Sequence, residues 1–413
     1  MKILHTSDWH IGRTLYAKKR YAEFEAFLTW LVETIEREGV NALLIAGDVF
    51  DTGTPSNRAQ ELYYEFLARV ARSAFCRHIV ITAGNHDSPT FLDAPRKILR
   101  ALHVHVIGLA AGPESLEEEV LTLLDGDGVP ELLVCAVPYL RDRDIRTSEA
   151  GETLEDKQRK MLEGVRSHYA GVCGLAERKR QELGETLPVV GMGHLFAAGG
   201  QTVTGDGVRE LYVGSLAEVG SDIFPDTLDY VALGHLHVPQ KVHGSDYRRY
   251  SGSPLPMGFG EARQEKIVCL VEFSGRQAEV RTLPVPVFQR LEHVEGDWEG
   301  IAGRLKRLEE EKSEVWLEVE YNGTEVIGDL RQRLDEIVSG NGLEILCIKN
   351  NQVREHALNS QFAGETLDSL DVDKVFERRL DAEGNLSGEQ RQELMATYRE
   401  IVQIVEEQDV QKE

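Results

Sequence analysis

The sequence predicts a layered α/β fold with a polar site at one edge of its sheets. From residue 1 to about residue 285, short apolar runs alternate with stretches of helical periodicity, which is the pattern of such a fold. Five of these runs lead directly into Asp, Asn or His. In open α/β sheets, ligands bind beyond the carboxyl ends of the strands, so the same segments predict both the fold and a site.

The five strand ends share one pattern, in which a short apolar run precedes a polar side chain. A single Asp after a strand would more often be a turn former or a helix cap. Repetition over five strands favours a shared site instead. The expected strands and the polar residues that follow them are 2–6 with Asp8 and His10, 41–46 with Asp48, 78–83 with Asn85 and His86, 187–193 with His194, and 230–234 with His235 and His237.

The segments between and after these strands predict the remaining layers. Apolar residues at three- and four-residue spacing predict amphipathic helices over 24–35 and 62–70. The charged stretch 149–185 predicts a surface excursion with helices over 155–169 and 175–182. Sequences typical of β-hairpins then close this part of the chain, near 250–254 and over 267–273 and 278–283.

A domain boundary is expected at Leu283-Pro284-Val285-Pro286, where two prolines follow a strand. Beyond it the pattern predicts a small α/β unit, with helices over 298–308 and 325–338 and strands over 315–321 and 343–349. A linker over 350–369 and two amphipathic helices are expected next. The helices either pack on their own domain or dock a partner helix. We therefore divide the chain into residues 1–284, 285–350 and 351–413.

Composition limits the class of protein. A chain of 413 residues is long enough for two or three domains. Its 46 Lys and Arg against 70 Asp and Glu give a net charge of -24, which argues against a generally basic nucleic-acid surface. The five cysteines form no C-x-x-C pair, so neither a disulfide framework nor a thiolate zinc site is indicated. Without a signal-peptide pattern or a membrane span, we expect a cytoplasmic protein.

The strand-end residues form a candidate metal-ligand set. Neutral imidazoles mixed with oxygen donors suit first-row divalent ions. The set is too large for one ion, and a bridging Asp48 would give a two-metal hydrolase site. Two dications would leave net positive charge to meet a phosphate, even in an acidic protein. The candidate ligands are Asp8, His10, Asp48, Asn85, His194, His235 and His237.

Two further residues of these motifs are expected to act in catalysis. His86 lies between Asn85 and Asp87 and can face the scissile phosphate as a general acid or a positive hydrogen-bond donor. Asp51, three residues after Asp48, could accept a hydrogen bond from the far nitrogen of His86 and fix its tautomer. The alternative for Asp51 is a simple turn residue before Gly53.

The order D-x-H, G-D-x-x-D, G-N-H-D, G-H, G-H-x-H, spread over residues 8–237, is similar to the signature of the calcineurin-like metallophosphoesterases. More narrowly, residues 3–12, 46–53, 250–254 and 375–380 resemble the SbcD family of bacterial nuclease subunits. The resemblance implies a β-sandwich flanked by helices, a small α/β cap domain that meets DNA, and C-terminal helices. It also implies one ion on Asp8, His10, Asp48 and His237, and another on Asp48, Asn85, His194 and His235.

The resemblance further implies a manganese-dependent DNA nuclease, with ATP-dependent exonuclease action on duplex ends and endonuclease action on single strands and hairpins. Its implied partners are DNA, a second copy bound through the nuclease domain, and the SbcC ATPase bound by the C-terminal helices, two copies of each subunit. ATP would belong to SbcC, since this chain has no G-x-x-x-x-G-K-[ST] loop. Two alternatives are a phosphoesterase acting on small nucleotides or phosphoproteins, and a noncatalytic scaffold that keeps the cluster for stability.

Overall fold

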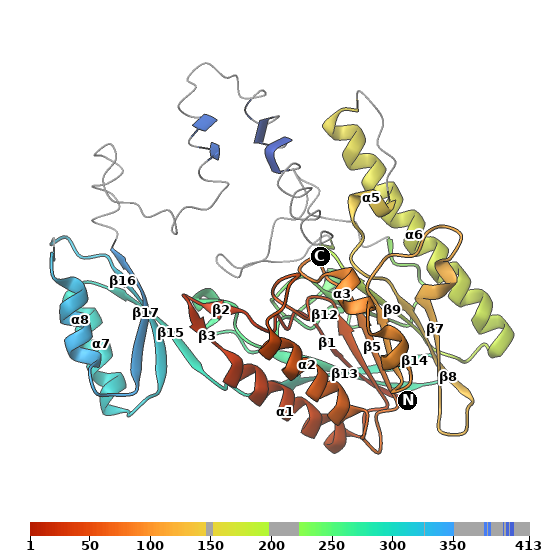
Figure 1. Cartoon of the computed structure of the whole chain (residues 1–413), viewed down its shortest axis with the longest axis horizontal. Helices are drawn as coiled ribbons and strands as arrows, with labels where there is room; N and C mark the ends of the chain where they lie inside the picture. The colour runs from red at the N-terminus through yellow and green to blue at the C-terminus, as the bar shows by residue number, and fades with distance from the viewer. Residues whose placement is uncertain are drawn as a thin grey trace.

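The computed structural model describes residues 1–145, 152–197, 223–325 and 327–350, and ten positions between 376 and 399. Its larger part contains two six-stranded sheets that pack face to face, with helices on their outer faces (Figure 1). This arrangement confirms the predicted layered fold. A smaller three-stranded sheet with two helices forms a separate body at the left of the view.

The first six-stranded sheet carries three of the five predicted strand ends. Its order is β14-β13-β1-β4-β5-β6, in which β1, β4, β5 and β6 are parallel and β13 and β14 form the predicted antiparallel hairpin. Phe24, Phe27 and Phe66, from the two predicted amphipathic helices, are buried against its outer face. The elements are β1 (Lys2–Thr6), β4 (Ala42–Ala46), β5 (His78–Thr82), β6 (Val104–Ile107), β13 (Ile267–Ser274), β14 (Gln277–Pro284), α1 (Tyr21–Glu38), α2 (Asn57–Val70), α3 (Pro89–Asp93) and α4 (Arg96–Arg100).

The second six-stranded sheet carries the other two strand ends. Its order is β11-β12-β10-β9-β8-β7, and its parallel strands are β8, β9, β10 and β12. Leu44 and Val80 of the first sheet and Met192 of the second belong to one apolar core layer between the sheets. The elements are β7 (Val120–Leu124), β8 (Pro130–Ala136), β9 (Val189–His194), β10 (Tyr230–Gly234), β11 (Gln240–Lys241), β12 (Arg248–Tyr250), α5 (Asp142–Ile145) and α6 (Leu154–Leu183).

Two helices differ from their predicted limits. The stretch expected to hold two helices is the single helix α6, which begins with a capping box between Thr153 and Asp156. Gly171 lies within this helix against Leu116, where a Cβ would be only 2.7 Å from a leucine methyl carbon, so this close contact favours glycine. In the small domain, α8 (Leu330–Val338) begins later than the predicted 325–338.

The small sheet packs one face on helices and turns the other toward the larger part of the chain. Its strands β15 (Arg290–Gly296), β16 (Val315–Tyr321) and β17 (Leu343–Asn350) are parallel, and α7 (Trp298–Glu310) and α8 share their apolar core. The short hairpin of β2 (Thr14–Leu15) and β3 (Lys18–Lys19) reaches the other face. Tyr16 donates to Glu318 at 2.8 Å, and Lys18 bonds Glu344 at 2.7 Å.

Most of the predicted C-terminal linker and helix pair lies outside the described residues. Among those described, Phe376 and Tyr398 stack with their ring centroids 4.0 Å apart, and Leu380 is buried. The predicted division into 1–284, 285–350 and 351–413 stays a prediction. Within the part of the chain that the structure describes, no helix combines the length and apolar character needed to cross a bilayer.

Candidate metal centre

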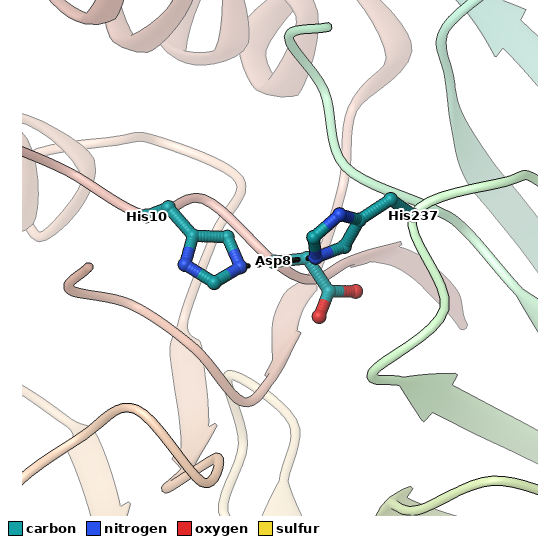
Figure 2. Close-up of side chains that lie close together, drawn as sticks. All are labelled: Asp8, His10 and His237. Atoms are coloured by element: carbon teal, nitrogen blue, oxygen red, sulfur yellow. Dashed lines mark hydrogen bonds between the residues drawn. The ribbon is translucent and has the colours of Figure 1, made fainter. Parts of the chain in front are cut away.

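The five predicted strand ends meet where the carboxyl edges of the two large sheets come together. The main-chain N–H of His235, after β10, donates to the carboxylate of Asp8, after β1, at 2.8 Å. His10 and His237 point their Nε2 atoms at one another at 3.1 Å, with Asp8 beside them (Figure 2). The two i, i+2 motifs predicted from sequence therefore meet at one shared site.

Asp48 lies between two groups of these side chains. Its Oδ2 is 3.2 Å from His194 Nε2 and 3.6 Å from His10 Nε2. On the far side, His194 Nε2 is 3.0 Å from the side-chain oxygen of Asn85, and the His194 and His235 rings lie 5.3 Å apart. All seven predicted ligands are thus gathered at one place, and all except Asn85 are buried.

The backbone at the site takes conformations that are unusual for these residue types. Asp8, His10 and Asp48 have φ values of 53°, 49° and 51°, in the left-handed region. Short polar side chains tolerate this region better than branched ones, because they can hydrogen-bond locally. The chain thereby turns sharply after β1 and β4 and directs these side chains across the sheet edge.

Two motif glycines allow the strand ends to approach closely. Gly47 has a φ of 84°, and a Cβ there would overlap the imidazole of His194. A Cβ on Gly84 would overlap the carboxylate of Asp48. The glycine that precedes the polar residue in each of these motifs is therefore a requirement of packing, since any side chain would push neighbouring strand ends apart.

Burial and close charges give the acidic and basic groups divergent pKa values. Burial alone would raise the pKa of Asp48, but His194, His86 and His10 hold it well below its usual value. Burial raises the pKa of Asp8 to about 6, with Asp48 adding to the rise. The site therefore favours an ionised Asp48 beside a second carboxyl that is harder to ionise.

The pKa values of two imidazoles at the site also shift in opposite directions. Burial opposes protonation of His194, but Asp48 raises its pKa to about 9. Burial lowers the pKa of His235 to about 3, and the neighbouring His194 contributes to the fall. The carboxylate of Asp48 thus favours a positive charge beside it. A bound cation would replace a proton on His194, because metal ligation needs neutral imidazole.

The predicted hydrogen bond from His86 to the Asp51 side chain is corrected by the structure. His86 Nδ1 lies 2.9 Å from the main-chain oxygen of Asp51. The Asp51 carboxylate instead faces His10 Nδ1 at 3.4 Å and Arg13 at 3.2 Å. A main-chain carbonyl fixes the His86 tautomer as well as a carboxylate would, so the aspartate side chain is left to orient His10.

Two residues beside the site were not predicted as part of it. Asp87 is buried and accepts main-chain N–H bonds from Val49, Phe50 and Gly84 at 2.9 to 3.1 Å, which ties the loops after β4 and β5 together. The sequence did offer a sign of this role, because Asp87 is the last residue of the motif Gly84-Asn85-His86-Asp87. Glu261, which lies 3.9 Å from His237 Nδ1 and pairs with the buried Lys266, had no local signal.

The donor set fits divalent metal ions. Within the described residues, three groups of ligand atoms at this edge lie within 4.8 Å of one another: Asp8 with His10 and His237, Asp8 with Asp48 and His194, and His10 with Asp48 and His86. Imidazole nitrogens and carboxylate oxygens turned toward one point, without thiolate, suit first-row divalent ions. The buried Nδ1 of His10 lacks a well-formed hydrogen bond but faces Asp51, as the outer nitrogen of a metal-bound histidine does.

Fold and site together define the class of protein. The family model described as "Calcineurin-like phosphoesterase" matches residues 1–239. These residues contain all five strand ends and all seven predicted ligands. The chain is therefore a metal-dependent hydrolase of phosphate esters. A second family model, described as "Type 5 capsule protein repressor C-terminal domain", matches residues 287–384.

The narrower family follows from relatives that match along nearly the whole chain. The SbcD component of the SbcCD nuclease of Escherichia coli K12 is 38% identical over 96% of this chain and 97% of the relative. Proteins of the same name from Rhodobacter capsulatus and Bacillus subtilis are 40% and 34% identical, over 69% and 66% of both chains. The chain belongs to the SbcD family of calcineurin-like phosphoesterases.

Proposed function

We propose that this chain is the manganese-dependent nuclease subunit of an SbcCD complex. In this role it would act as an ATP-dependent double-strand exonuclease and as an endonuclease on single strands and hairpins, in DNA end processing, repair and recombination. The observation that carries the proposal is the match to a protein named as a nuclease subunit over 96% of this chain. A small-substrate phosphoesterase would need neither the small α/β unit nor the C-terminal segment that this match includes.

The proposed metal ligands form two sets that share Asp48. One ion would be held by Asp8, His10, Asp48 and His237. The other would be held by Asp48, Asn85, His194 and His235. The short distances from Asp48 to His10 and His194 support a shared carboxylate. When bound, the ions would supply positive charge beside the phosphate and a means of activating water. The donor set fits first-row divalent ions, and the choice of manganese among them rests on the resemblance to the SbcD family.

The proposed catalytic residue of the chain itself is His86. Its main-chain N–H donates to Asp48 at 2.8 Å, and its Nδ1 is fixed by the Asp51 carbonyl. The ring lies 4.8 Å from that of His10, beside the ligand cluster. His86 can therefore hold a proton at Nε2 and give it to the departing sugar oxygen. We propose Asp51 as a positioning residue for His10 and, through its main chain, for His86.

The proposed partners follow from the same family relation. We propose binding to the SbcC ATPase through the C-terminal segment, a homodimer through the nuclease domain, and two copies of each subunit in the complex. The three-stranded sheet and its helices would act as a cap beside bound DNA. Work on chromosomal DNA would place the complex in the bacterial cytoplasm.

The test is manganese-dependent cleavage of a labelled, hairpin-ended DNA duplex, with and without SbcC and ATP. Bis-p-nitrophenyl phosphate is the small-diester control. We expect DNA cleavage by wild-type protein and duplex degradation that rises with SbcC and ATP. Turnover of the small diester without any DNA cleavage would favour a small-substrate phosphoesterase instead.

A matched pair of variants separates the metal centre from general surface effects. The Asp48→Ala variant should lose both ions and all cleavage. Asp127→Ala makes the same change on an exposed loop, and this variant should keep both ions and its cleavage activity. Two ions still bound to the Asp48→Ala variant would contradict the shared ligand. Cleavage without any divalent ion would contradict the proposed chemistry altogether.

A further inference from the structure

A second cluster of metal-ligating side chains lies on the small sheet, on different elements from the phosphoesterase centre. In the parallel register of β15 and β16, His293 pairs with Glu318 and Glu295 pairs with Glu320. Residues two apart on a strand point to the same face. These four side chains therefore share one face of the sheet, while the intervening Val294 and Val319 face the core beneath α7 and α8.

The ligand atoms of three of these residues converge. His293 Nε2 is 3.7 Å from a carboxylate oxygen of Glu295 and 3.6 Å from one of Glu320. The three atoms lie within 4.8 Å of one another. Bonds of about 2.1 Å to a tetrahedral zinc ion put neighbouring ligand atoms roughly 3.4 Å apart, which is close to the two distances from His293 Nε2.

The fourth residue, Glu318, fixes the proton of the imidazole. Its carboxylate is buried and lies 2.8 Å from His293 Nδ1. It also accepts from Tyr16 and pairs with Lys349, so its position is set from three sides. A proton held on Nδ1 leaves the lone pair of Nε2 directed at Glu295 and Glu320. Metal-bound histidines in proteins show this carboxylate partner on their outer nitrogen.

The charges at this position are compatible with a bound cation. Glu295 and Glu320 stand directly opposite each other on neighbouring strands, and like charges in that relation destabilise a sheet. Lys349 stands opposite Glu320 in the register of β16 and β17, and its ammonium contacts Glu318 at 2.9 Å. A dication between the two carboxylates and Nε2 would convert the repulsion into attraction. The site is open to solvent, since the side chain of Glu295 is 67% exposed.

We propose that His293, Glu295 and Glu320 bind one divalent transition-metal ion, with Zn²⁺ the best fit, and that Glu318 orients the histidine. One nitrogen and two carboxylate oxygens leave a coordination position for water. Such an ion joins β15 to β16. Through Glu318 and Tyr16 it also fixes the small sheet against the β2–β3 hairpin, which follows directly on His10 and Arg13.

The test compares the number of zinc ions bound by full-length variants. Protein stripped with chelator is equilibrated with zinc, passed through a desalting column and analysed for metal by mass spectrometry. The test variant is Glu295→Gln/Glu320→Gln. The matched control is Glu272→Gln/Glu279→Gln, because that exposed pair also lies in register on neighbouring strands but is not among the candidate metal groups.

We expect the test variant, and also His293→Gln, to bind one ion fewer than the wild type and the control. Equal metal counts in all four proteins would overturn the proposal. Circular dichroism establishes that each variant is folded. A second measurement needs no variant: crystals of wild-type protein soaked in zinc should show anomalous scattering within bonding distance of His293 Nε2. A peak only at the phosphoesterase centre would also overturn the proposal.

Discussion

Replacing His86 with alanine should separate proton transfer from the rest of catalysis. The variant keeps the main-chain N–H that bonds Asp48 at 2.8 Å, so the geometry of that carboxylate is preserved. It loses only the imidazole held by the Asp51 carbonyl. A positioned general acid contributes roughly 10²- to 10⁴-fold, which corresponds to about 3 to 5 kcal/mol of transition-state stabilisation. We expect a loss of this size in kcat/KM for DNA.

The assay uses two substrates that differ in their leaving groups. The sugar oxygen of DNA must be protonated as it departs, whereas p-nitrophenolate leaves without a proton. The His86→Ala variant should therefore lose less than about tenfold on bis-p-nitrophenyl phosphate, because its general-acid contribution is not needed there. His103→Ala, on an exposed histidine at the opposite end of the sheet, should match the wild type on both substrates. Equal losses on the two substrates would refute the assignment and point to a metal-binding or structural role for His86.

Three further predictions concern glycine packing, a buried histidine and the small domain. Gly84→Ala should abolish metal binding and cleavage while the chain still folds, because its methyl group would overlap the Asp48 carboxylate; a full metal count in this variant would contradict the packing argument. Burial lowers the pKa of His5 to about 3. As the pH falls below about 6.5, His5 therefore takes up a proton in the unfolded chain before it does so in the folded protein. Between pH 7 and pH 5 this group should lower the free energy of unfolding of the wild type by about 2 kcal/mol. Urea unfolding of the His5→Gln variant should lack this part of the pH dependence. Leu305→Ala should destabilise the small domain by about 2 to 5 kcal/mol, because Leu305 is fully buried in its core, and a smaller change in the urea midpoint would show that the cavity collapses.

The sequence predicted those parts of the fold and the site that depend on residues close together in the chain. Each of the five motifs combines a buried strand, a glycine and a polar residue within about ten positions, and these features follow from burial, close approach and strand direction. The gathering of Asp8, Asp48 and His194 could therefore be predicted without knowing which strands pair. The helices over α1 and α2 were predictable for the same reason, since one apolar stripe specifies one buried face.

Contacts between distant segments left no such signal. Tyr16 and Glu318 are 302 positions apart, and nothing near either residue indicates the other. The contact of His86 with Asp51 was misassigned because it uses a main-chain oxygen, which every residue type possesses. Helix α6 continues through three glycines, and one of them, Gly171, packs closely against Leu116, a tertiary contact that has no local signal.

The left-handed backbone at Asp8, His10 and Asp48 has a consequence for how this chain tolerates change. A residue other than glycine in that region destabilises the folded state by roughly 1 kcal/mol relative to glycine. The three positions together therefore lower the free energy of unfolding by a few kcal/mol. Selection for thermal tolerance alone should enrich glycine and asparagine at these positions. Selection for turnover should remove the same variants, so the residues least favourable to the fold are those that an active lineage must retain.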